Sequence, residues 1–316
     1  MSKILVCISL VSILAATMIM PNLSFISAAQ EPKFKEGEVI IGLKGATQDF
    51  KQSLITLGAT VKREMPQLNA FCVKVPKGTE DSFIENVKAR PEVAYAEKNG
   101  MGEAAFIPND PSWNLQWNMP MIKANASWDT YRGSTEIVIA ILDTGVDYNH
   151  PDIAPNYKVG GYDWYNNDFD PIDDYDHGTH CAGIAAAALN NAIGVAGVAQ
   201  VKIWAEKILS STGGGYVDDL AFGIVHATDK GVNVISMSLQ NYPYSTLVEN
   251  AVDYAYGKGV LLVSAAGNAA KNIDTNPSYP ASYTNVVAVS ATNSADNFDS
   301  SYSNYGNKIE VSAPGT

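Results

Sequence analysis

The sequence predicts an α/β domain built on a parallel sheet with helices on both faces, preceded by a small α+β domain. Two patterns indicate this organisation. Residues 37–99 contain short strands and two amphipathic helices, whereas the chain after Pro111 alternates fully apolar strands with helices. The 316 residues are 46% hydrophobic and 17% charged, which suits two packed cores and excludes a disordered, collagen-like or multi-span membrane chain.

The first domain has the element order of a ferredoxin-like fold. We expect strands at 39–43, 61–64, 70–75 and 93–96, and helices at 49–57 and 80–88. This β-α-β-β-α-β order defines the ferredoxin-like arrangement, which many binding modules share. Residues 98–109, which contain Gly100, Gly102 and Pro108, are predicted to form a linker.

The second domain is predicted from a series of apolar segments. We expect strands at 137–142, 203–209, 232–239, 260–264, 286–290 and 309–311, and helices at 179–189, 217–230 and 247–258. Strands that are buried on both faces are apolar throughout, which indicates a parallel sheet between two layers of helices. Functional sites in such sheets lie beyond the carboxyl ends of the strands.

The first 29 residues predict an export signal. A charged start at Lys3 precedes an apolar run over residues 4–20 and the small residues Ser27 and Ala29, as at a signal cleavage site. The apolar run also approaches the length of a membrane span, so an uncleaved anchor remains the alternative. We expect a secreted protein with a signal peptide at 1–29, a first domain at 30–104 and a second domain at 105–316.

Charge is distributed unevenly between the two domains. The chain has 21 Lys+Arg and 33 Asp+Glu, a formal net charge of −12, which excludes an electrostatic nucleic-acid binder. Residues 30–104 carry 11 basic and 11 acidic side chains, whereas residues 105–316 carry 9 and 22, a net charge of −13. The cysteines, Cys7, Cys72 and Cys181, predict no disulfide framework, and bound calcium would be a plausible substitute in an exported protein.

Asp143 directly follows the apolar strand 137–142. A carboxylate held rigidly at the end of a strand can accept a hydrogen bond from a histidine. Taken alone, the segment is explained more simply by an aspartate that starts a turn before Gly145.

His177 opens the segment His-Gly-Thr-His-Cys-Ala-Gly-Ile, which holds two of the four histidines at a Gly-rich helix entry. Small residues let a substrate approach the imidazole, and a helix N-terminus disfavours the imidazolium form, so a general base is indicated. A zinc site is a weak alternative, because His177 and His180 lack a nearby third ligand at a usual zinc spacing. A packed core histidine is the other alternative.

Asn268 follows the strand 260–264 through the segment Ser264-Ala265-Ala266-Gly267. A side-chain amide presented there can donate to a developing oxyanion. In isolation, an asparagine that caps the turn after Gly267 is the simpler interpretation.

Together these segments resemble the subtilases, the subtilisin-like serine endopeptidases, and in particular the thermitase-like branch with Cys after His-Gly-Thr-His. The resemblance covers residues 109–316. It implies that Asp143 orients and stabilises the imidazole, that His177 is the general acid and base, and that Asn268 donates to the oxyanion. It also implies that Cys181 packs beneath the site, and that the protein is a monomer that hydrolyses polypeptides.

The resemblance further implies three substrate-binding segments. Two would form walls around the side chain before the scissile bond, and the third would pair with the substrate backbone as an added strand. The wall residues would be Ser238, Leu239, Gln240, Ala265, Ala266 and Gly267, and the edge residues Thr212, Gly213 and Gly214. A flexible loop is the alternative for these glycines. Gln240-Asn241 replace glycines that are usual in the family, and their side chains are expected to intrude on the pocket rim.

Similarity to thermitase-like members implies structural calcium and no organic cofactor. The stronger site would use Asp110, Asp152 and Asn191 with the carbonyls of Ala188, Ile193 and Val195, a mixture of oxygen ligands that suits calcium. The weaker site would use Asp163, Asn166, Asp168 and Asp170, for which a solvated acidic loop is the alternative.

The first domain resembles a subtilisin-type propeptide, which assists folding and inhibits its own protease until it is cleaved. Its final strand near residues 95–99 would lie along the substrate groove like a product. We expect cleavage between about residues 99 and 109.

The resemblance also requires a serine nucleophile in a Gly-Thr-Ser-Met-Ala segment after an Ala-Pro-Gly turn. The turn is present at 313–315, and residues 1–316 contain no such serine segment. We therefore expect a fragment of a secreted proprotease that supplies Asp143 and His177 but not the serine, and that is inactive as given. The alternative is a catalytically dead, calcium-stabilised binding or protease-inhibitor protein.

Overall fold

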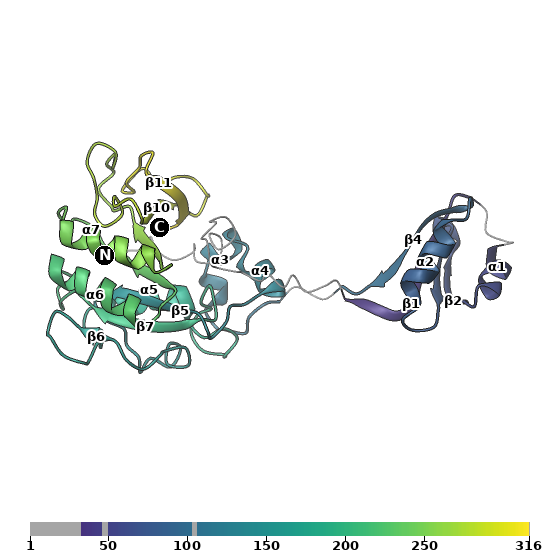
Figure 1. Cartoon of the computed structure of the whole chain (residues 1–316), viewed down its shortest axis with the longest axis horizontal. Helices are drawn as coiled ribbons and strands as arrows, with labels where there is room; N and C mark the ends of the chain where they lie inside the picture. The colour runs from purple at the N-terminus through teal and green to yellow at the C-terminus, as the bar shows by residue number, and fades with distance from the viewer. Residues whose placement is uncertain (1–32, 46–49, 103–105, 316) are drawn as a thin grey trace. The chain divides into compact units, whose positions relative to one another are not determined.

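The structure is a computed structural model that describes residues 33–45, 50–102 and 106–315 (Figure 1). The signal peptide expected at 1–29 lies outside the described residues. The described chain forms two compact units, one before and one after residues 103–105. In the part of the chain that is described, none of the helices has the length and apolar character needed to cross a membrane.

The first unit is a four-stranded antiparallel sheet with two helices. Its elements are β1 (Phe34–Leu43), α1 (Phe50–Thr56), β2 (Thr60–Met65), the 3-10 turn η2 (Pro66–Leu68), β3 (Ala70–Lys74), α2 (Glu80–Lys88) and β4 (Val93–Gly100). The strand order is β2-β3-β1-β4, and every neighbouring pair is antiparallel. The predicted β-α-β-β-α-β order is confirmed.

The core of the first unit lies between this sheet and its helices. Val39 and Ile41 of β1 and Phe71 of β3 are fully buried, and they pack in one cluster with Leu54 of α1 and Val87 of α2. From Gly37 to Leu43, β1 is buried except for the half-buried Ile40. Successive side chains of a strand point to opposite faces, so Val39, Ile41 and Leu43 share the face that the helices cover.

A buried carboxylate fastens the last strand of the first unit. Glu38 of β1 is 4% exposed, and its carboxylate accepts hydrogen bonds from Lys62 Nζ at 2.6 and 2.7 Å and from Asn99 Nδ2 of β4 at 2.8 Å. The hydrogen bonds from Lys62 and then Asn99 lower the pKa of Glu38 to about 2. Glu38 therefore stays ionised at any physiological pH and anchors the end of β4.

The second unit contains a seven-stranded parallel sheet with strand order β11-β10-β9-β8-β5-β7-β6. The strands are β5 (Val138–Asp143), β6 (Tyr162–Asp163), β7 (Lys202–Lys207), β8 (Val234–Met237), β9 (Leu261–Ala265), β10 (Val287–Thr292) and β11 (Ile309–Pro314). The helices are η3 (Trp113–Leu115), α3 (Asn118–Met121), α4 (Ala124–Thr130), α5 (His177–Ala186), α6 (Val217–Asp229) and α7 (Thr246–Gly257). The six predicted strands and three predicted helices are confirmed, whereas β6, η3, α3 and α4 were not predicted.

Helices cover both faces of this sheet. Ile139 and Ile141 of β5 belong to a buried cluster with Ala182 of α5, whereas Leu142 belongs to a second cluster with Ile224 of α6. Helices α6 and α7 lie side by side over that second face (Figure 1). Because the strands are parallel, their carboxyl ends share one edge of the sheet, and the candidate site residues lie along that edge.

Candidate active site

Asp143 is the last residue of β5, and its side chain is 1% exposed. Its Oδ1 accepts a 2.7 Å hydrogen bond from the Thr144 amide and lies 2.5 Å from Nδ1 of His177. Its Oδ2 is buried and has no hydrogen-bond partner among the described residues. The structure thus brings the carboxylate and the histidine, which are far apart in the sequence, into direct contact.

Two glycines allow the end of β5 and the start of α5 to meet. Gly145 has a φ of 107°, and a Cβ there would lie 2.6 Å from the Pro171 carbonyl oxygen. A Cβ on Gly178 would lie 2.1 Å from the Gly145 carbonyl oxygen and 3.0 Å from Cβ of Asp143. Larger residues would push these segments apart, so the His177–Asp143 contact depends on backbone packing as well as on side-chain conformation.

Asp173 ties the same two segments together, although sequence reasoning missed it. Its Oδ1 accepts a hydrogen bond from Thr144 Oγ1 at 2.7 Å, and its Oδ2 accepts from the amide and hydroxyl of Thr179 at 2.8 and 2.6 Å. Burial alone would raise the pKa of Asp173, but the hydrogen bonds from Thr179 and Thr144 outweigh burial and lower it. From the sequence, the nearby acidic residues Asp163, Asp168 and Asp170 are assigned to the weaker calcium site, and no role is given to Asp173.

His177 is a stronger base than a free imidazole. Burial alone would lower its pKa, but the hydrogen bond to Asp143 and the negative charges of Asp143 and Asp173 outweigh burial, so the pKa of His177 is raised. This direction is opposite to the one expected from a helix N-terminus alone. A carboxylate in contact with the ring outweighs the partial positive charge of a helix end.

Cys181 lies one helical turn after His177 and is 5% exposed. Its Sγ donates a hydrogen bond to the Ser238 hydroxyl at 3.1 Å. Ligand atoms of Asp143, His177 and Cys181 lie within 4.8 Å of one another, the only group of three His, Cys, Asp or Glu residues that does so in the described chain. The thiol is therefore packed against the Asp143–His177 pair, while His180 of the same segment is exposed.

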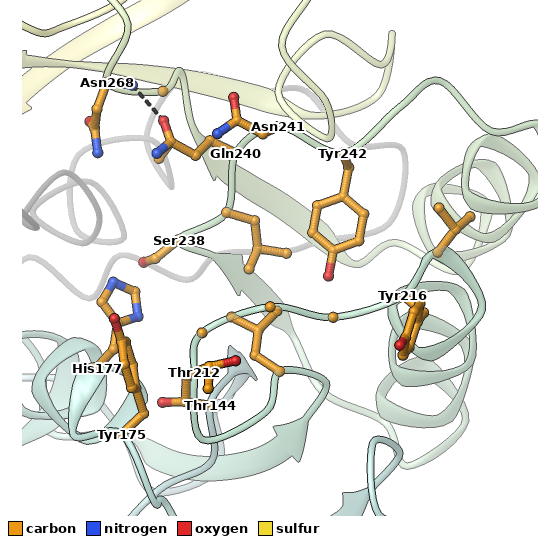
Figure 2. Close-up of a pocket in the computed structure, with 18 of the residues that line it drawn as sticks. Thr144, Tyr175, His177, Thr212, Tyr216, Ser238, Gln240, Asn241, Tyr242 and Asn268 are labelled. Carbon is orange, nitrogen blue, oxygen red and sulfur yellow. Dashed lines mark hydrogen bonds between the residues drawn. The ribbon is translucent and has the colours of Figure 1, made fainter.

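A pocket with a volume of 660 Å³ opens beside His177 (Figure 2). Its walls come from the segments that follow β7, β8 and β9. The predicted residues that line it are Thr212, Gly213, Gly214, Ser238, Leu239, Gln240, Ala265, Gly267 and Asn268. Asn241, whose side chain was expected at the rim, also lines the pocket. Lining residues that the prediction missed are Thr144, Tyr175, Leu209, Gly215, Tyr216, Val217, Tyr242 and Pro243. Ala266 is not among the lining residues, since it is 1% exposed and its amide donates to the Val289 carbonyl.

Gln240 connects two walls of this pocket. Its Oε1 accepts a 2.8 Å hydrogen bond from the Asn268 backbone amide, drawn as a dashed line in Figure 2. The next residue, Asn241, has a φ of 64°, a left-handed conformation that asparagine tolerates better than most residues. The side chain of Gln240 thus lies at the pocket rim, as the sequence predicted.

Lys207 is a buried cation under the same edge of the sheet. It is the last residue of β7 and is 1% exposed. Its Nζ donates to the carbonyls of Thr144 at 2.6 Å and Leu209 at 3.0 Å, and to the Asp174 carboxylate at 2.5 Å. It therefore joins the turn after Asp143, the pocket wall and the acidic loop, a role that its sequence context did not reveal.

The residues of the first candidate calcium site lie close together. Asp110 and Asp152 are 3% and 1% exposed. Asn191 bonds to both, through its amide to Asp110 at 3.2 Å and through Nδ2 to Asp152 at 2.8 Å, and the Val195 amide donates to Asp152 at 2.8 Å. Neither carboxylate forms an ion pair with a Lys or Arg of the described residues. Two buried carboxylates without a basic partner among the described residues fit a cation site, to which Ala188, Ile193 and Val195 would add carbonyls.

The second candidate calcium set is only partly assembled. Asp163 is 2% exposed, and its two oxygens accept from the amide and the side chain of Asn166, each at 2.8 Å. Asp168 forms a backbone bridge to Asp163. Asp170 instead accepts a 2.7 Å hydrogen bond from the Tyr148 hydroxyl. The Asp170 amide donates to Asp168 Oδ1 at 2.9 Å, so hydrogen bonds link all four residues, although the Asp170 carboxylate is engaged with Tyr148.

The fold and the site together define the class of protein: a subtilisin-like α/β fold with an Asp–His pair and a pocket at the carboxyl edge of its parallel sheet. Residues 134–316 match the Subtilase family, and the chain belongs to that family. Residues 22–99 match the fervidolysin N-terminal prodomain. The predicted fold class and the resemblance to subtilases with a propeptide are confirmed.

Curated relatives agree with this assignment. The thermophilic serine proteinase of Bacillus sp. (strain AK1) is 39% identical over 286 residues, which cover 89% of this chain and 70% of the relative. Thermitase of Thermoactinomyces vulgaris is 45% identical over 213 residues, 67% of this chain and 74% of thermitase. The halolysin-like extracellular serine protease Nep of Natrialba magadii is 33% identical over 300 residues, 90% of this chain and 55% of Nep.

A solved structure shows the same fold. A protease from Pseudoalteromonas arctica PAMC 21717 superposes with a TM-score of 0.58 at 32% sequence identity, over 66% of this chain and 72% of that protein.

Proposed function

We propose that this chain belongs to a secreted serine endopeptidase made as a zymogen, and that it supplies the aspartate and histidine of an Asp-His-Ser triad. The observation that carries the proposal is the 2.5 Å contact between Nδ1 of His177 and the buried Asp143 carboxylate, at the rim of a pocket. A histidine held by a carboxylate on one ring nitrogen can exchange a proton through the other. Membership of the subtilase family supports the same reaction.

Each candidate catalytic group has a separate task in the proposed mechanism. Nε2 of His177 takes the proton from a serine hydroxyl and returns it to the leaving amine, while Asp143 stabilises the imidazolium. Asn268, which lines the pocket, donates to the oxyanion of the tetrahedral intermediate. No serine hydroxyl of the described residues hydrogen-bonds to the His177 ring, and residues 1–316 contain no Gly-Thr-Ser-Met-Ala segment, so the nucleophile is not assigned to any serine of this sequence.

The first unit would act as the intramolecular inhibitor. The prodomain match supports this role, and the anchoring of Asn99 to Glu38 supports a fixed exit for the chain at the end of β4. Cleavage would fall between about residues 99 and 109. An N-terminal sequence of the secreted protein that begins outside this range would contradict the assignment.

Calcium would stabilise the second unit. Asp110, Asp152 and Asn191 with the carbonyls of Ala188, Ile193 and Val195 would hold the stronger site, and Asp163, Asn166, Asp168 and Asp170 the weaker one. The first site is supported by the burial of the Asp110 and Asp152 carboxylates, neither of which forms an ion pair with a Lys or Arg of the described residues. The second is supported by the hydrogen bonds that link its members. The ion would supply the positive charge that these loops lack.

Secretion would follow from the signal-like segment 1–29. The name of the relative Nep, which describes an extracellular protease, supports the same localisation. Export of a fusion of residues 1–29 to a reporter, with loss of the segment from the mature product, tests this assignment and its alternative, a retained anchor.

The function is tested by casein hydrolysis with the coding sequence read and expressed past codon 316. We expect hydrolysis that a serine-directed inhibitor abolishes and that His177→Ala lowers by a factor of about 10³ or more. His180→Ala is the matched control, because it removes the exposed histidine of the same segment, and it should stay within about threefold of the wild type. A stable secreted product without inhibitor-sensitive hydrolysis would favour the binding or inhibitor protein.

A further inference from the structure

Gln240 bridges the ends of two neighbouring strands. Gln240 and Asn268 each follow the last residue of a strand, β8 and β9 respectively, by three positions. These strands are parallel neighbours, with Met237 opposite Ser264 at the end of the ladder. Beyond that pair a side chain makes the connection, because Gln240 Oε1 accepts the Asn268 amide at 2.8 Å (Figure 2).

The gap that Gln240 crosses belongs to the pocket beside His177. In Figure 2, Ser238 and Gln240 lie on one side of the gap and Asn268 on the other, with the His177 ring next to Ser238. Together with the segment after β7, these two walls border the pocket, and the gap between them is one entry for a substrate side chain. The Gln240 side chain lies across that passage.

The opposite wall has no room to yield. Gly267 precedes Asn268 and has a φ of 104°. A Cβ at this position would lie 2.6 Å from Asn304 Nδ2 and 2.9 Å from Ser278 Oγ, so the backbone already packs directly against these side chains. The width of the passage is therefore determined mainly by the residue at position 240.

We propose that Gln240 is a specificity-determining residue that restricts the substrate residue before the scissile bond to small side chains. This inference rests on the proposed function. The described residues that line the pocket include no Lys, Arg, Asp or Glu. The pocket therefore has no charged side chain of these types with which to select a substrate side chain, and we expect it to select by size. An aromatic side chain would have to displace Gln240 and break its bond to Asn268 before it could enter.

The sequence of the linker agrees with a preference for small residues. The segment in which we expect cleavage of the first domain contains Gly100, Gly102, Ala104 and Ala105. An enzyme that processes its own linker would find a small residue directly before four peptide bonds there, those that follow residues 100, 102, 104 and 105. A glutamine at the pocket rim would suit such a cleavage site.

The experiment uses the protein expressed past codon 316, because no serine of residues 1–316 is assigned as nucleophile. It compares two tetrapeptide anilides that differ only in Ala or Phe before the scissile bond. Misfit of one methylene in an enzyme pocket changes kcat/KM by about 10- to 200-fold, so we expect the wild type to prefer Ala by about 10-fold or more. Gln240→Gly should raise the Phe/Ala ratio of kcat/KM by about 10-fold or more, chiefly through a lower KM for Phe. The loss of the hydrogen bond to Asn268 would change kcat/KM for both substrates equally. A change in the Phe/Ala ratio of kcat/KM therefore reports on size selection alone.

Two further variants and a binding measurement complete the test. Gln240→Glu keeps the length of the side chain and an acceptor for the Asn268 amide, so it should keep the wild-type ratio. Gln240→Ala is the second short variant, to be used if the glycine variant does not fold. Fluorescence titration with product tetrapeptides that end in Ala or Phe should give the same change in ratio without turnover.

Two results would overturn the proposal: a wild type that prefers Phe, or short variants whose Phe/Ala ratio stays within about twofold of the wild type. Either would leave the proposed function intact, because the peptides would still be cleaved. If no form of the protein cleaves or binds either peptide, the pocket is not a peptide subsite, and the proposed function fails together with this inference.

Discussion

The ammonium group of Lys207 donates a 2.6 Å hydrogen bond to the backbone carbonyl of Thr144, the residue that follows Asp143. The same Nζ reaches the Leu209 carbonyl and the Asp174 carboxylate. A single buried cation therefore holds three segments that border the candidate site. Its role is to position these segments, since it supports the lining residues Thr144 and Leu209 from behind and does not itself line the pocket.

Replacement of Lys207 by Met should lower the free energy of unfolding by about 2–3 kcal/mol, because two buried carbonyls lose their donor. Denaturant unfolding of the second unit measures this loss. Lys202→Met is the control on the same strand, since Lys202 Nζ bonds to the Pro155 carbonyl at the surface, and it should change stability by less than about 0.5 kcal/mol. Equal effects of the two substitutions would show that the buried contacts of Lys207 contribute little.

Gly178→Ala should separate the end of β5 from the start of α5. Its Cβ would lie 2.1 Å from the Gly145 carbonyl oxygen, so the helix must move, and a displacement of about 1 Å at the acid–base pair costs about 10²-fold in kcat. Gly183→Ala is the matched control in the same helix, because its Cβ would meet only Ile153 Cδ1, at 3.8 Å. Alanine favours helices more than glycine does, so the control should be neutral or stabilising by about 0.5–1 kcal/mol. Similar activity of the two variants would contradict the role of the glycine.

Asp143→Asn should lower kcat by about 10⁴, since the amide neither stabilises the imidazolium nor selects the correct tautomer. It should also move the acid limb of the kcat/KM profile to lower pH, because the carboxylate that raises the pKa of His177 is gone. Asp147→Asn is the control, as Asp147 lies in the same turn region and accepts only a local bond from the Asn149 amide. An acid limb that stays in place in Asp143→Asn would refute the assignment of that limb to His177.

The protonation of His177 should also appear in the stability of the fold. Because its pKa is raised in the folded state, its contribution is fully present below the unfolded pKa of about 6.5 and is lost as the pH rises through the folded pKa. The difference in unfolding free energy between the wild type and His177→Ala should therefore decrease with rising pH over this window. Urea unfolding at several pH values measures the difference, and one that grows with pH would show that the folded pKa is lowered instead.

Removal of calcium by a chelator should lower the melting temperature of the second unit. A ligand present at 100 times its Kd stabilises a fold by about 2.7 kcal/mol, and that contribution should disappear with the ion. Asp152→Asn should remove most of the response to the chelator, and Asp253→Asn, an acidic residue outside both candidate sites, should leave it intact. A melting temperature that does not change on chelation would rule out both calcium sites.

The strands and the acid–base pair were predictable because their signals are local. Fully apolar runs such as 137–142 give a buried parallel strand regardless of what surrounds them. The motif His-Gly-Thr-His at residues 177–180 is specific enough to indicate a site from the sequence, before the position of Asp143 relative to His177 is known. Residues after strands were expected at one edge of the sheet, and Asp143 and Asn268 lie there.

The missed features depend on contacts between distant segments. Lys207 is buried because of what packs around the end of β7, and nothing in its neighbouring residues distinguishes it from a surface lysine. Asp173 lies among acidic residues that suggest solvent or a cation, although its carboxylate accepts hydrogen bonds from two threonines and from the amides of Tyr175 and Asp176. The strand β6 has only two residues, and α3 and α4 are too short to show a helical period.

The loop between Asp143 and His177 is closed at its base. The Val146 amide donates to the Pro171 carbonyl, and Gly145 packs against the same carbonyl, so the chain leaves the sheet and returns to it at one point. Everything between residues 147 and 170 is an excursion that starts and ends beside the acid–base pair without supplying either member. The excursion carries β6 and the candidate calcium residues Asp152 and Asp163, so ion binding and acid–base chemistry would be encoded in separate stretches of the chain, and one could be redesigned without rewriting the other.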